Sequence, residues 1–485
     1  MKRTAVGTNA SLLLLLIFAA CGGGGDGTRP PELGTLAYVE TECRGTSEGF
    51  VERQALRIRE GDREPVTVFE TPEVSLPGAG FYCPVSVLLR FGDQSIAREA
   101  FQSVAVSPDG SSVVFEATDE FSTQPPLPLN LPPEQKGIFW VRADGTGLRR
   151  LGPPSRERFF YINENLGVDE FGALAFSPSG RTVAFADKGP DADDHEADQV
   201  VTIDVATGTR TQVTHLAPAV PPAGYPRNAP TVFVSLFIDE QTIGFSSCAN
   251  PNGLNPEGTY LQMTIKTDGS GLEVPVPIPI ALPGGVIEEQ FVITGDKPQA
   301  LVVVVPGKPT NDPPLDLPGI REIFLVDEGK NILQLTNFGR QDTLSAVVDV
   351  DREHVYFTAS ADPLGTNPSL NCQIFSIDRL GANLRQLTNF HEIEHSVIGC
   401  LFTQLGRGCG IYFPLVGQDP RSRTLVFYSD CDPLGTNPNG GQIFAIQPDG
   451  SGLRQLTDSR GLGQEADGTP IGELPGPWAY GPYVP

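Results

Sequence analysis

Short apolar segments recur along the chain, and each is separated from the next by a tight polar turn. Residues 104–117 read VAVSPDGSSVVFEA and residues 174–187 read LAFSPSGRTVAFAD, so that a Ser-Pro turn lies between two apolar runs in both. Further along a unit, an Ile is followed 13 residues later by a Leu, as in Ile374 and Leu387, across a turn that contains Gly. Apolar runs bounded by such turns are typical of β-hairpins. The pattern therefore predicts units of four short antiparallel strands, each unit a meander.

Two stretches in the last third of the chain are nearly the same. Residues 361–388 read ADPLGTNPSLNCQIFSIDRLGANLRQLT, and residues 431–457 read CDPLGTNPNGGQIFAIQPDGSGLRQLT. A phrase that recurs at several tens of residues is the signature of a repeat architecture, in which neighbouring units bury one another's apolar faces. Six complete units can be counted, and they begin near residues 101, 171, 231, 287, 343 and 410.

The two ends of the chain predict how this array closes. Residues 34–74 contain a second, a third and a fourth strand with no first strand before them, and residues 476–481 lie where a further first strand is due. Pairing of the C-terminal strand with the N-terminal fragment completes one more unit and leaves no open sheet edge. The sequence thus predicts an all-β fold of seven four-stranded units in a closed circle, with six or eight units as alternatives.

The order of these motifs resembles the β-propeller repeat of the TolB-like family: a Ser-Pro-Asp-Gly turn with a β-run, an Ile-Phe strand, an Asp-Gly turn and Leu-Thr. The resemblance covers residues 34–485 and implies a β-propeller with blades of four strands. It implies little about function, because similar propellers serve periplasmic interaction proteins, prolyl-oligopeptidase-type peptidases and some polysaccharide lyases. The chain departs from TolB itself in leaving no room for the additional α/β domain, so partner contacts made by that domain are not implied.

The first residues predict export and attachment to a membrane. A basic start precedes a short apolar run that ends in Phe18-Ala19-Ala20-Cys21. The run is too short for a permanent membrane span. A small-residue pair followed by Cys resembles a bacterial lipobox, which implies lipidation of Cys21; a plain signal peptide is the alternative. The expected segments are a lipoprotein signal peptide at 1–20, a lipidated Cys and flexible Gly-rich tether at 21–33, and the TolB-like propeller at 34–485.

Charge and export together limit the partners. The chain has 34 basic and 59 acidic residues and a formal net charge of −25, which argues against nucleic acid and against electrostatic adhesion to anionic lipid. Contact with a membrane is therefore expected through the lipid anchor only. The expected location is the cell envelope, on the outer membrane and facing the periplasm or the cell surface.

Eight cysteines are present, and those that follow Cys21 would tend to oxidise in an exported protein. The first predicted disulfide joins Cys400 and Cys409, which close a short glycine-rich loop. The second joins Cys372 and Cys431, which occupy corresponding loops of neighbouring units. No Cys-x-x-Cys spacing occurs, which argues against a zinc ribbon or a thioredoxin-like redox site.

Long insertions all fall on one face of the predicted propeller, which we call the long-loop face: the loops between second and third strands and the segments that cross between units. Loops on a rigid scaffold are where binding residues usually lie. Three of these loops carry Asx-Pro pairs, which build rigid turns. Their polar residues are candidates for a binding rim, although turn rigidity is the favoured interpretation: Asn250, Asp362, Asn367, Asp432 and Asn437.

Candidate metal ligands form two groups. The acidic run at 191–198 offers Asp191, Asp193, Asp194 and Asp198, which suit calcium or another divalent cation but lack the spacing of an EF-hand. His391 and His395 belong to an H-E-x-x-H pattern, which needs a helix that the surrounding residues do not predict. The Gly-x-Ser-x-Gly match at 45–49 likewise lacks the helix of a nucleophile elbow. A solvated acidic loop and a plain loop serine are favoured, so no cofactor and no catalytic residue is assigned.

The leading hypothesis is a non-enzymatic, lipid-anchored cell-envelope propeller. It would act as a binding or scaffold module for an envelope protein or a peptidoglycan-associated partner through the long-loop face. The alternative is a metal-dependent polysaccharide lyase or hydrolase at the mouth of the central channel.

Overall fold

The described part of the chain is built almost entirely of strands and turns. The structure is a computed structural model, and it describes residues 33–77, 90–91, 94–95, 101–118, 131–156, 174–221, 231–258, 260–274, 285–293, 299–306, 322–327, 332–338, 345–348, 354–359, 361–390, 411–418, 424–429, 431–437 and 440–481. Within these ranges the helices are two short 3-10 segments, Pro133–Gln135 (η1) and Pro251–Gly253 (η2). None of the described helices is long and apolar enough to cross a membrane. The all-β prediction is confirmed.

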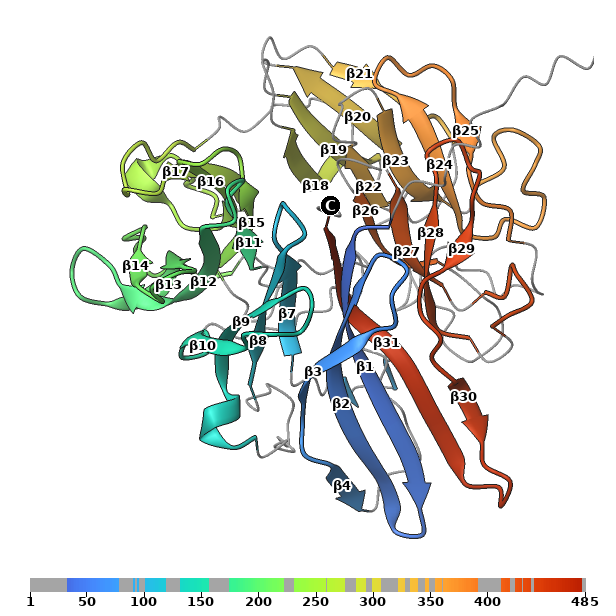
Figure 1. The fold of residues 1–485 in the computed structure, drawn as a ribbon. Helices are drawn as coiled ribbons and strands as arrows, with labels where there is room; N and C mark the ends of the chain where they lie inside the picture. The colour runs from blue at the N-terminus through green and yellow to red at the C-terminus, as the bar shows by residue number, and fades with distance from the viewer. Residues whose placement is uncertain are drawn as a thin grey trace, which may run out of the picture. The chain divides into compact units, whose positions relative to one another are not determined.

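The first internal sheets follow the chain in order (Figure 1). One sheet has the order β10-β9-β8-β7 and is formed by β7 (Phe101–Val106), β8 (Ser112–Ala117), β9 (Gly137–Arg142) and β10 (Arg149–Gly152). The next is formed in sequence order by β11 (Ala175–Phe176), β12 (Thr182–Pro190), β13 (Glu196–Asp204) and β14 (Arg210–Gln212). A three-stranded sheet follows, with β15 (Val232–Phe237), β16 (Thr242–Ser247) and β17 (Leu261–Lys266). Its expected fourth strand is reduced to a single bridge between Thr264 and Glu273.

Three more four-stranded sheets repeat the same antiparallel meander. They contain β18 (Gly285–Ile293), β19 (Gln299–Pro306), β20 (Glu322–Asp327) and β21 (Ile332–Gln334); β22 (Ser345–Val348), β23 (His354–Ala359), β24 (Gln373–Asp378) and β25 (Arg385–Gln386); and β26 (Ile411–Gln418), β27 (Leu425–Ser429), β28 (Gln442–Ile446) and β29 (Arg454–Gln455). The predicted order of strands within a unit is confirmed in each of them.

The last sheet joins the two ends of the described chain, and we call it the joint sheet. Its order is β3-β2-β1-β31-β30, with β4 also paired to β2. The strands are β1 (Thr35–Thr46), β2 (Gly49–Glu60), β3 (Val66–Glu70), β4 (Val74–Pro77), β30 (Gly461–Gln464) and β31 (Pro470–Gly481); β5 (Arg90–Phe91) and β6 (Gln94–Ser95) form a separate pair. The antiparallel pairing of β1 with β31 confirms closure by the C-terminal strand. These meanders and their joint define a β-propeller, whose blade number stays a prediction.

Two polar segments carry more paired strand than the sequence indicated. Residues 45–49, where a loop serine was expected, form the tight end of a hairpin, because β1 runs to Thr46 and β2 begins at Gly49. The acidic run at 191–198 was expected as a solvated loop, yet its last three residues belong to β13. In β1 and β2 exposed polar residues alternate with buried ones, and the polar content concealed this period of two.

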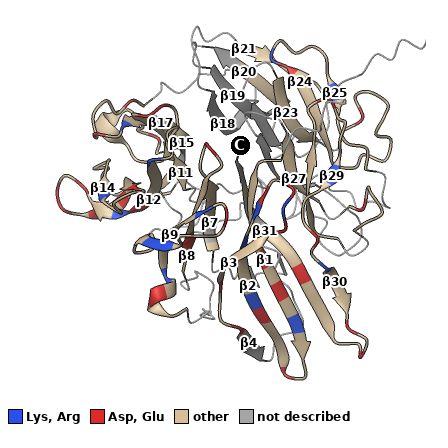
Figure 2. Cartoon of the chain, viewed as in Figure 1, with Lys and Arg blue, Asp and Glu red and all other residues tan. Residues whose placement is uncertain are grey.

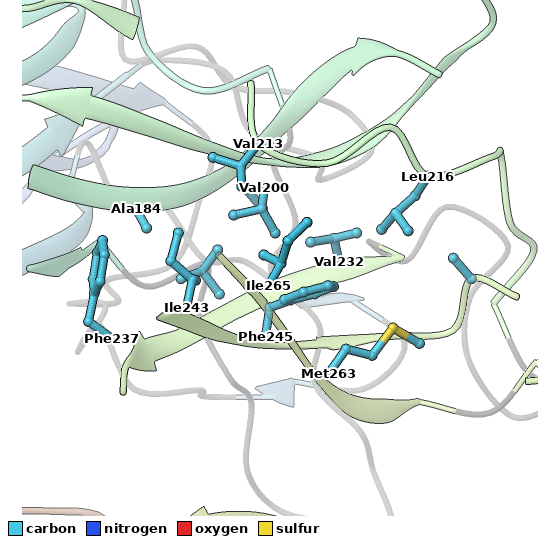
Figure 3. Close-up of a cluster of buried hydrophobic side chains, with 13 residues drawn as sticks. Ala184, Val200, Val213, Leu216, Val232, Phe237, Ile243, Phe245, Met263 and Ile265 are labelled. Atoms are coloured by element: carbon cyan, nitrogen blue, oxygen red, sulfur yellow. The ribbon is translucent and has the colours of Figure 1, made fainter. Parts of the chain in front are cut away.

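The apolar core lies between neighbouring sheets. Second and third strands place phenylalanines directly opposite one another, and the rings of Phe115 and Phe139 stack at a centroid distance of 5.3 Å, as those of Phe357 and Phe375 do at 5.6 Å. Figure 3 shows one interface, in which Val200 and Val213 face Phe245 and Met263 of the next sheet. Each sheet therefore buries its apolar side chains only with the help of its neighbour.

Glycine turns add a second contact between consecutive sheets. The turns after the third strands contain Gly208, Gly269 and Gly450, each with φ between 73° and 84°. A Cβ at these positions would lie 2.7 Å from Leu151 O, 3.0 Å from Val213 O and 3.2 Å from Leu387 O, respectively, all on the outer strand of the preceding sheet or just after it. Glycine is required here for both its conformation and its size.

Candidate functional site

Strands β12 and β13 are paired without interruption up to the turn that joins them. Their register runs from Thr182 opposite Asp204 to Pro190 opposite Glu196. The tip therefore holds Asp191 to His195 in a tight turn. The predicted acidic segment is thus a rigid hairpin end, at the end of the blade where the long-loop face was expected.

Asp191 organises this tip. Its Oδ1 accepts hydrogen bonds from the backbone N–H groups of Asp193 and His195, both at 2.8 Å, and its Oδ2 lies 3.3 Å from His195 Nδ1. Desolvation raises the pKa of Asp191, but these hydrogen bonds outweigh it and hold the pKa below its usual value. Asp194 adopts φ 66°, a left-handed conformation that Asp tolerates in turns.

Two of the predicted metal ligands come together at the tip. Asp191, Asp193 and His195 place one oxygen or nitrogen atom each within 4.8 Å of one another. Calcium prefers six to eight oxygen ligands and zinc accepts mixed nitrogen and oxygen ligands, so this trio is an incomplete set for calcium. His195 joined the group although it was not among the predicted ligands. His391 and His395 lie outside the described residues.

Asp198 lies in the paired strands of the hairpin and not in its turn, because it is opposite Lys188 in the register of β12 and β13. Its side chain is buried, ion-pairs with Lys188, and accepts hydrogen bonds from the backbone N–H of Thr231 at 2.6 Å and from the Thr231 hydroxyl at 2.7 Å. These partners fix the start of the next sheet to the hairpin. The structure therefore gives Asp198 a structural position.

A buried polar group that the sequence did not reveal lies beside this hairpin. Asp187 of β12 pairs with Arg210 and accepts a hydrogen bond from the backbone N–H of Arg156 at 2.6 Å. Ser155 donates its backbone N–H to Glu116 Oε1 of the preceding sheet and its hydroxyl to Ala186 O at 2.7 Å. Burial lowers the pKa of Arg210, the nearby Glu116 opposes that change, and Arg156 adds to it.

The Asx-Pro loops are internally braced. The Oδ1 atoms of Asp362 and Asp432 accept the backbone N–H of Asn367 and Asn437, both at 2.7 Å, and Asn250 accepts that of Asn255 at 2.6 Å. The amide groups of the three asparagines donate back to the start of each loop, to Ala249 O, Ala361 O and Cys431 O, at 2.9–3.0 Å. Because these asparagines are buried, the geometry supports the rigid-turn interpretation. A binding role for the five rim residues stays a prediction.

Each braced loop presents a leucine to solvent. Leu364 is 44% exposed and Leu434 is 42% exposed at the same position of two loops, and Leu254 is 53% exposed in the third. Gly365 and Gly435 follow the first two leucines, and a Cβ added at either glycine would meet no other atom within 4 Å, so the apex is open. A fixed backbone thus carries an exposed apolar residue.

A repeated glutamine–threonine pair clamps the third and fourth strands. Gln373 Oε1 accepts the hydroxyl of Thr388 at 2.7 Å and the N–H of Phe390 at 3.1 Å, and its Nε2 donates to Phe390 O at 2.8 Å. Gln199 and Gln442 make the same bonds, and Glu322 accepts the hydroxyl of Thr336 at 2.6 Å in the equivalent place. The recurrent Gln-Ile-Phe and Gln-Leu-Thr motifs place the glutamine and the threonine at fixed positions of each unit, and the sequence analysis did not predict that the two side chains bond.

Cysteine chemistry agrees with part of the prediction. Cys372 and Cys431 are both disulfide-bonded and belong to the same buried cluster, and their bond to each other stays a prediction. Cys43 is also disulfide-bonded, whereas Cys248 is a buried free thiol whose pKa burial raises to about 11. The predicted Cys400–Cys409 bond, like Cys21, lies outside the described residues.

Comparisons with known proteins give no family for this chain. No protein-family model matches the chain, and no curated protein does either. Among solved structures, the chain resembles a tricorn protease (13% identity, 74% of this chain and 26% of that chain, TM-score 0.38), a protein assigned as TolB from Agrobacterium tumefaciens (11%, 91% and 99%, TM-score 0.32) and the β-propeller domain of the Trilobed protease from Pyrococcus furiosus (10%, 87% and 96%, TM-score 0.42). The chain spans about a quarter of the tricorn protease chain. The fold assignment rests on the strand order and register.

Proposed function

We propose that this protein is a non-enzymatic, lipid-anchored β-propeller of the bacterial cell envelope, similar to TolB-like lipoproteins. It binds an envelope protein or a cell-wall-associated partner through its long-loop face. The observation that carries the proposal is the pair of loops at 361–372 and 431–437. They share the same internal hydrogen bonds, and both display an exposed leucine. A pre-ordered loop loses little conformational entropy on binding, which favours such loops as recognition elements.

The anchor and the location are part of this proposal. Cys21 follows a small-residue pair after an apolar run, the sequence pattern on which the proposed lipid attachment rests. Growth with a labelled fatty acid should label the wild-type protein and leave a Cys21→Ala variant unlabelled. Membrane fractionation should recover the wild type with the outer membrane. Recovery with the inner membrane would contradict that location.

The binding face is tested by charge placed on the loop apices. The double variant Leu364→Asp and Leu434→Asp changes exposed side chains and leaves the bracing asparagines in place, so the fold should persist. Co-sedimentation with purified cell-wall sacculi and cross-linking in envelope preparations should both be compared with the wild type. We expect the double variant to lose either co-sedimentation with sacculi or cross-linking to an envelope protein, whichever reports the partner.

A matched control lies at the other end of β24, the strand that follows the loop with Leu364. Leu380, in the turn after β24, is 83% exposed, and Leu380→Asp places an aspartate away from the braced loops, with one added negative charge where the double variant has two. This variant should bind as the wild type does. Loss of binding on changing Leu380 alone would place the partner on the opposite face, and unchanged binding in all variants would exclude the loop apices.

A metal-dependent polysaccharide lyase or hydrolase is the second candidate. The convergence of Asp191, Asp193 and His195 favours it. Elemental analysis of the purified protein after dialysis against a chelator and separate reloading with Mn²⁺, Ca²⁺ or Zn²⁺ distinguishes the two. A stoichiometric ion whose removal abolishes polysaccharide cleavage, and which Asp193→Asn and His195→Ala weaken, would replace the binding-module proposal.

A further inference from the structure

Glu40 lies buried at the joint between the two ends of the described chain. It belongs to β1 and is 2% exposed. Its Oε1 accepts a hydrogen bond of 2.8 Å from the hydroxyl of Ser459, which precedes β30, and its Oε2 ion-pairs with Arg57 of β2. One carboxylate therefore connects the N-terminal hairpin to the C-terminal segment.

The pairing of β1 with β31 is irregular at this residue. The register shifts between Tyr38 and Glu40, and Glu40 lies opposite Pro475, which has no N–H to donate. The backbone ladder is thus interrupted where the carboxylate sits. The hydrogen bond from the Ser459 hydroxyl to the carboxyl of Glu40 adds a side-chain link between the two ends at this place.

The titratable groups around Glu40 come from three strands. β1 contributes Tyr38 and Glu42, β2 contributes Arg57 and Arg59, and β31 contributes Glu473, which is bonded to Arg460 at 2.6 Å. Burial raises the pKa of Tyr38, so its hydroxyl stays neutral over the pH range in which Glu40 titrates. Strands β7, β26 and β28 also pack against β31 and carry no Asp, Glu, His, Lys or Arg. Figure 2 shows charged residues of both signs along β1 and β2.

We propose that Glu40 makes the joint between β1 and β31 proton-dependent, so that protonation of its buried carboxyl tightens the closure of the propeller and ionisation loosens it. The device acts on the fold itself and does not depend on what the long-loop face binds. It would make closure respond to the pH of the compartment.

The electrostatics agree with the geometry. Burial raises the pKa of Glu40 from 4.5 to about 7, against the opposing effects of Arg57 and Ser459 and with smaller contributions from Glu473 and Glu42. A carboxyl with a raised pKa binds its proton more tightly in the folded protein than in the unfolded chain. Folding is therefore favoured at low pH, loses this contribution as the pH rises from about 4.5 through about 7, and changes no further above that range.

The test compares full-length wild type with Glu40→Gln, which keeps an acceptor for Ser459 and removes the charge. Thermal unfolding midpoints between about pH 5 and about pH 8 should fall with rising pH in the wild type, and this component should disappear in the variant. Hydrogen exchange should locate the effect: after correction for the intrinsic rate, amides of β1 and β31 should lose protection in the wild type at about pH 8 by a factor on the order of 100. Amides of β12 and β13 serve as the internal reference.

Two variants complete the design. Glu48→Gln changes an exposed carboxyl in the β1–β2 turn and should keep the wild-type pH dependence. Ser459→Ala removes a hydrogen bond that stabilises the ionised form, and it should move the wild-type transition to higher pH even if Glu40→Gln fails to fold. An identical pH slope in wild type and Glu40→Gln, or an unmoved transition in Ser459→Ala, would overturn the proposal.

Discussion

The joint sheet and the repeated internal sheets hold together by different means. The sheets of β22–β25 and β26–β29 carry neutral clamps, in which Gln373 and Gln442 bond to threonines, and each sheet contains a stacked pair of phenylalanines. The joint sheet instead carries ion pairs within each of its halves, two between β1 and β2 and one between Arg460 and Glu473. Internal sheets are assembled by a continuous stretch of chain, whereas the joint brings together strands from the two ends of the described chain. The contacts that cross between the halves include the backbone ladder of β1 and β31, the hydrogen bond from Ser459 to Glu40 and the exposed pair of Arg44 with Glu465.

Removal of β31 should have the largest effect on this comparison. A protein truncated before Pro470 loses the strand that pairs with β1 along most of its length, and it exposes an open edge beside Thr35–Thr46. We expect a loss of stability beyond the roughly 4–5 kcal/mol that already marks an exceptional single substitution. Thermal unfolding measures it. An unchanged midpoint would show that the joint contributes nothing to the whole propeller.

Removal of an internal clamp should have the next largest effect. Gln373→Ala leaves the hydroxyl of Thr388 and the backbone of Phe390 without their buried partner, at a cost of about 1–3 kcal/mol for each unsatisfied group. Denaturant unfolding gives the value. Glu322→Gln restores the neutral residue of the other units and is the matched control, expected to be neutral or stabilising. A larger loss in the control than in Gln373→Ala would contradict the shared role of this position.

One braced loop allows a buried, hydrogen-bonded residue to be compared with an exposed one. Asn367→Ala removes two buried hydrogen bonds to Ala361 O and Asn371 O and should destabilise by about 1–3 kcal/mol. Leu364→Asp, three residues earlier, should stay within about 0.5 kcal/mol of the wild type because the side chain is exposed. Both values come from the same denaturant titration. Equal losses in the two variants would mean that the leucine is packed.

The turn aspartates should give the smallest effect. Hydrogen bonds from the hydroxyl and the N–H of Ser451 hold the pKa of Asp449 below its usual value. The stabilisation is therefore fully present above the ordinary pKa of Asp and is lost as the pH falls through the lower, folded value. Asp449→Asn should reduce the loss of stability on acidification in unfolding experiments below about pH 4. This acid-side change is opposite in direction to the change expected for Glu40.

Much of the fold could be predicted from the sequence because the strand and turn motifs repeat. The spacing between Ile374 and Leu387 defined two strands and their turn, and the missing first strand at the N-terminus predicted the pairing of β1 with β31. The extension of β1 and β2 was missed because Glu42, Arg44 and Arg53 mimic the composition of a loop. In the structure these residues form one charged face of a strand pair.

The site was legible only in part. The rigid turns at Asp362 and Asp432 followed from Asx-Pro chemistry, and Asp191 with Asp193 was recognised as a cluster. Burial could not be read from the sequence. Asp198 was grouped with the aspartates of the turn although it lies in strand β13, and Glu40 was not singled out, because a single carboxylate in a polar stretch gives no sign that a distant serine will cover it.

The glycine turns have a consequence for how the propeller comes apart. Gly208, Gly269 and Gly450 each rest against a carbonyl of the preceding sheet, so every such turn is shared by two units. When the outer strand of one sheet frays, the glycine turn of the next sheet loses the backbone against which it packs. Opening therefore spreads in one direction along the chain. Cooperative unfolding of a repeat array depends on such nearest-neighbour contacts. A side chain at Gly269 would therefore loosen the sheet of β11–β14 as well as its own.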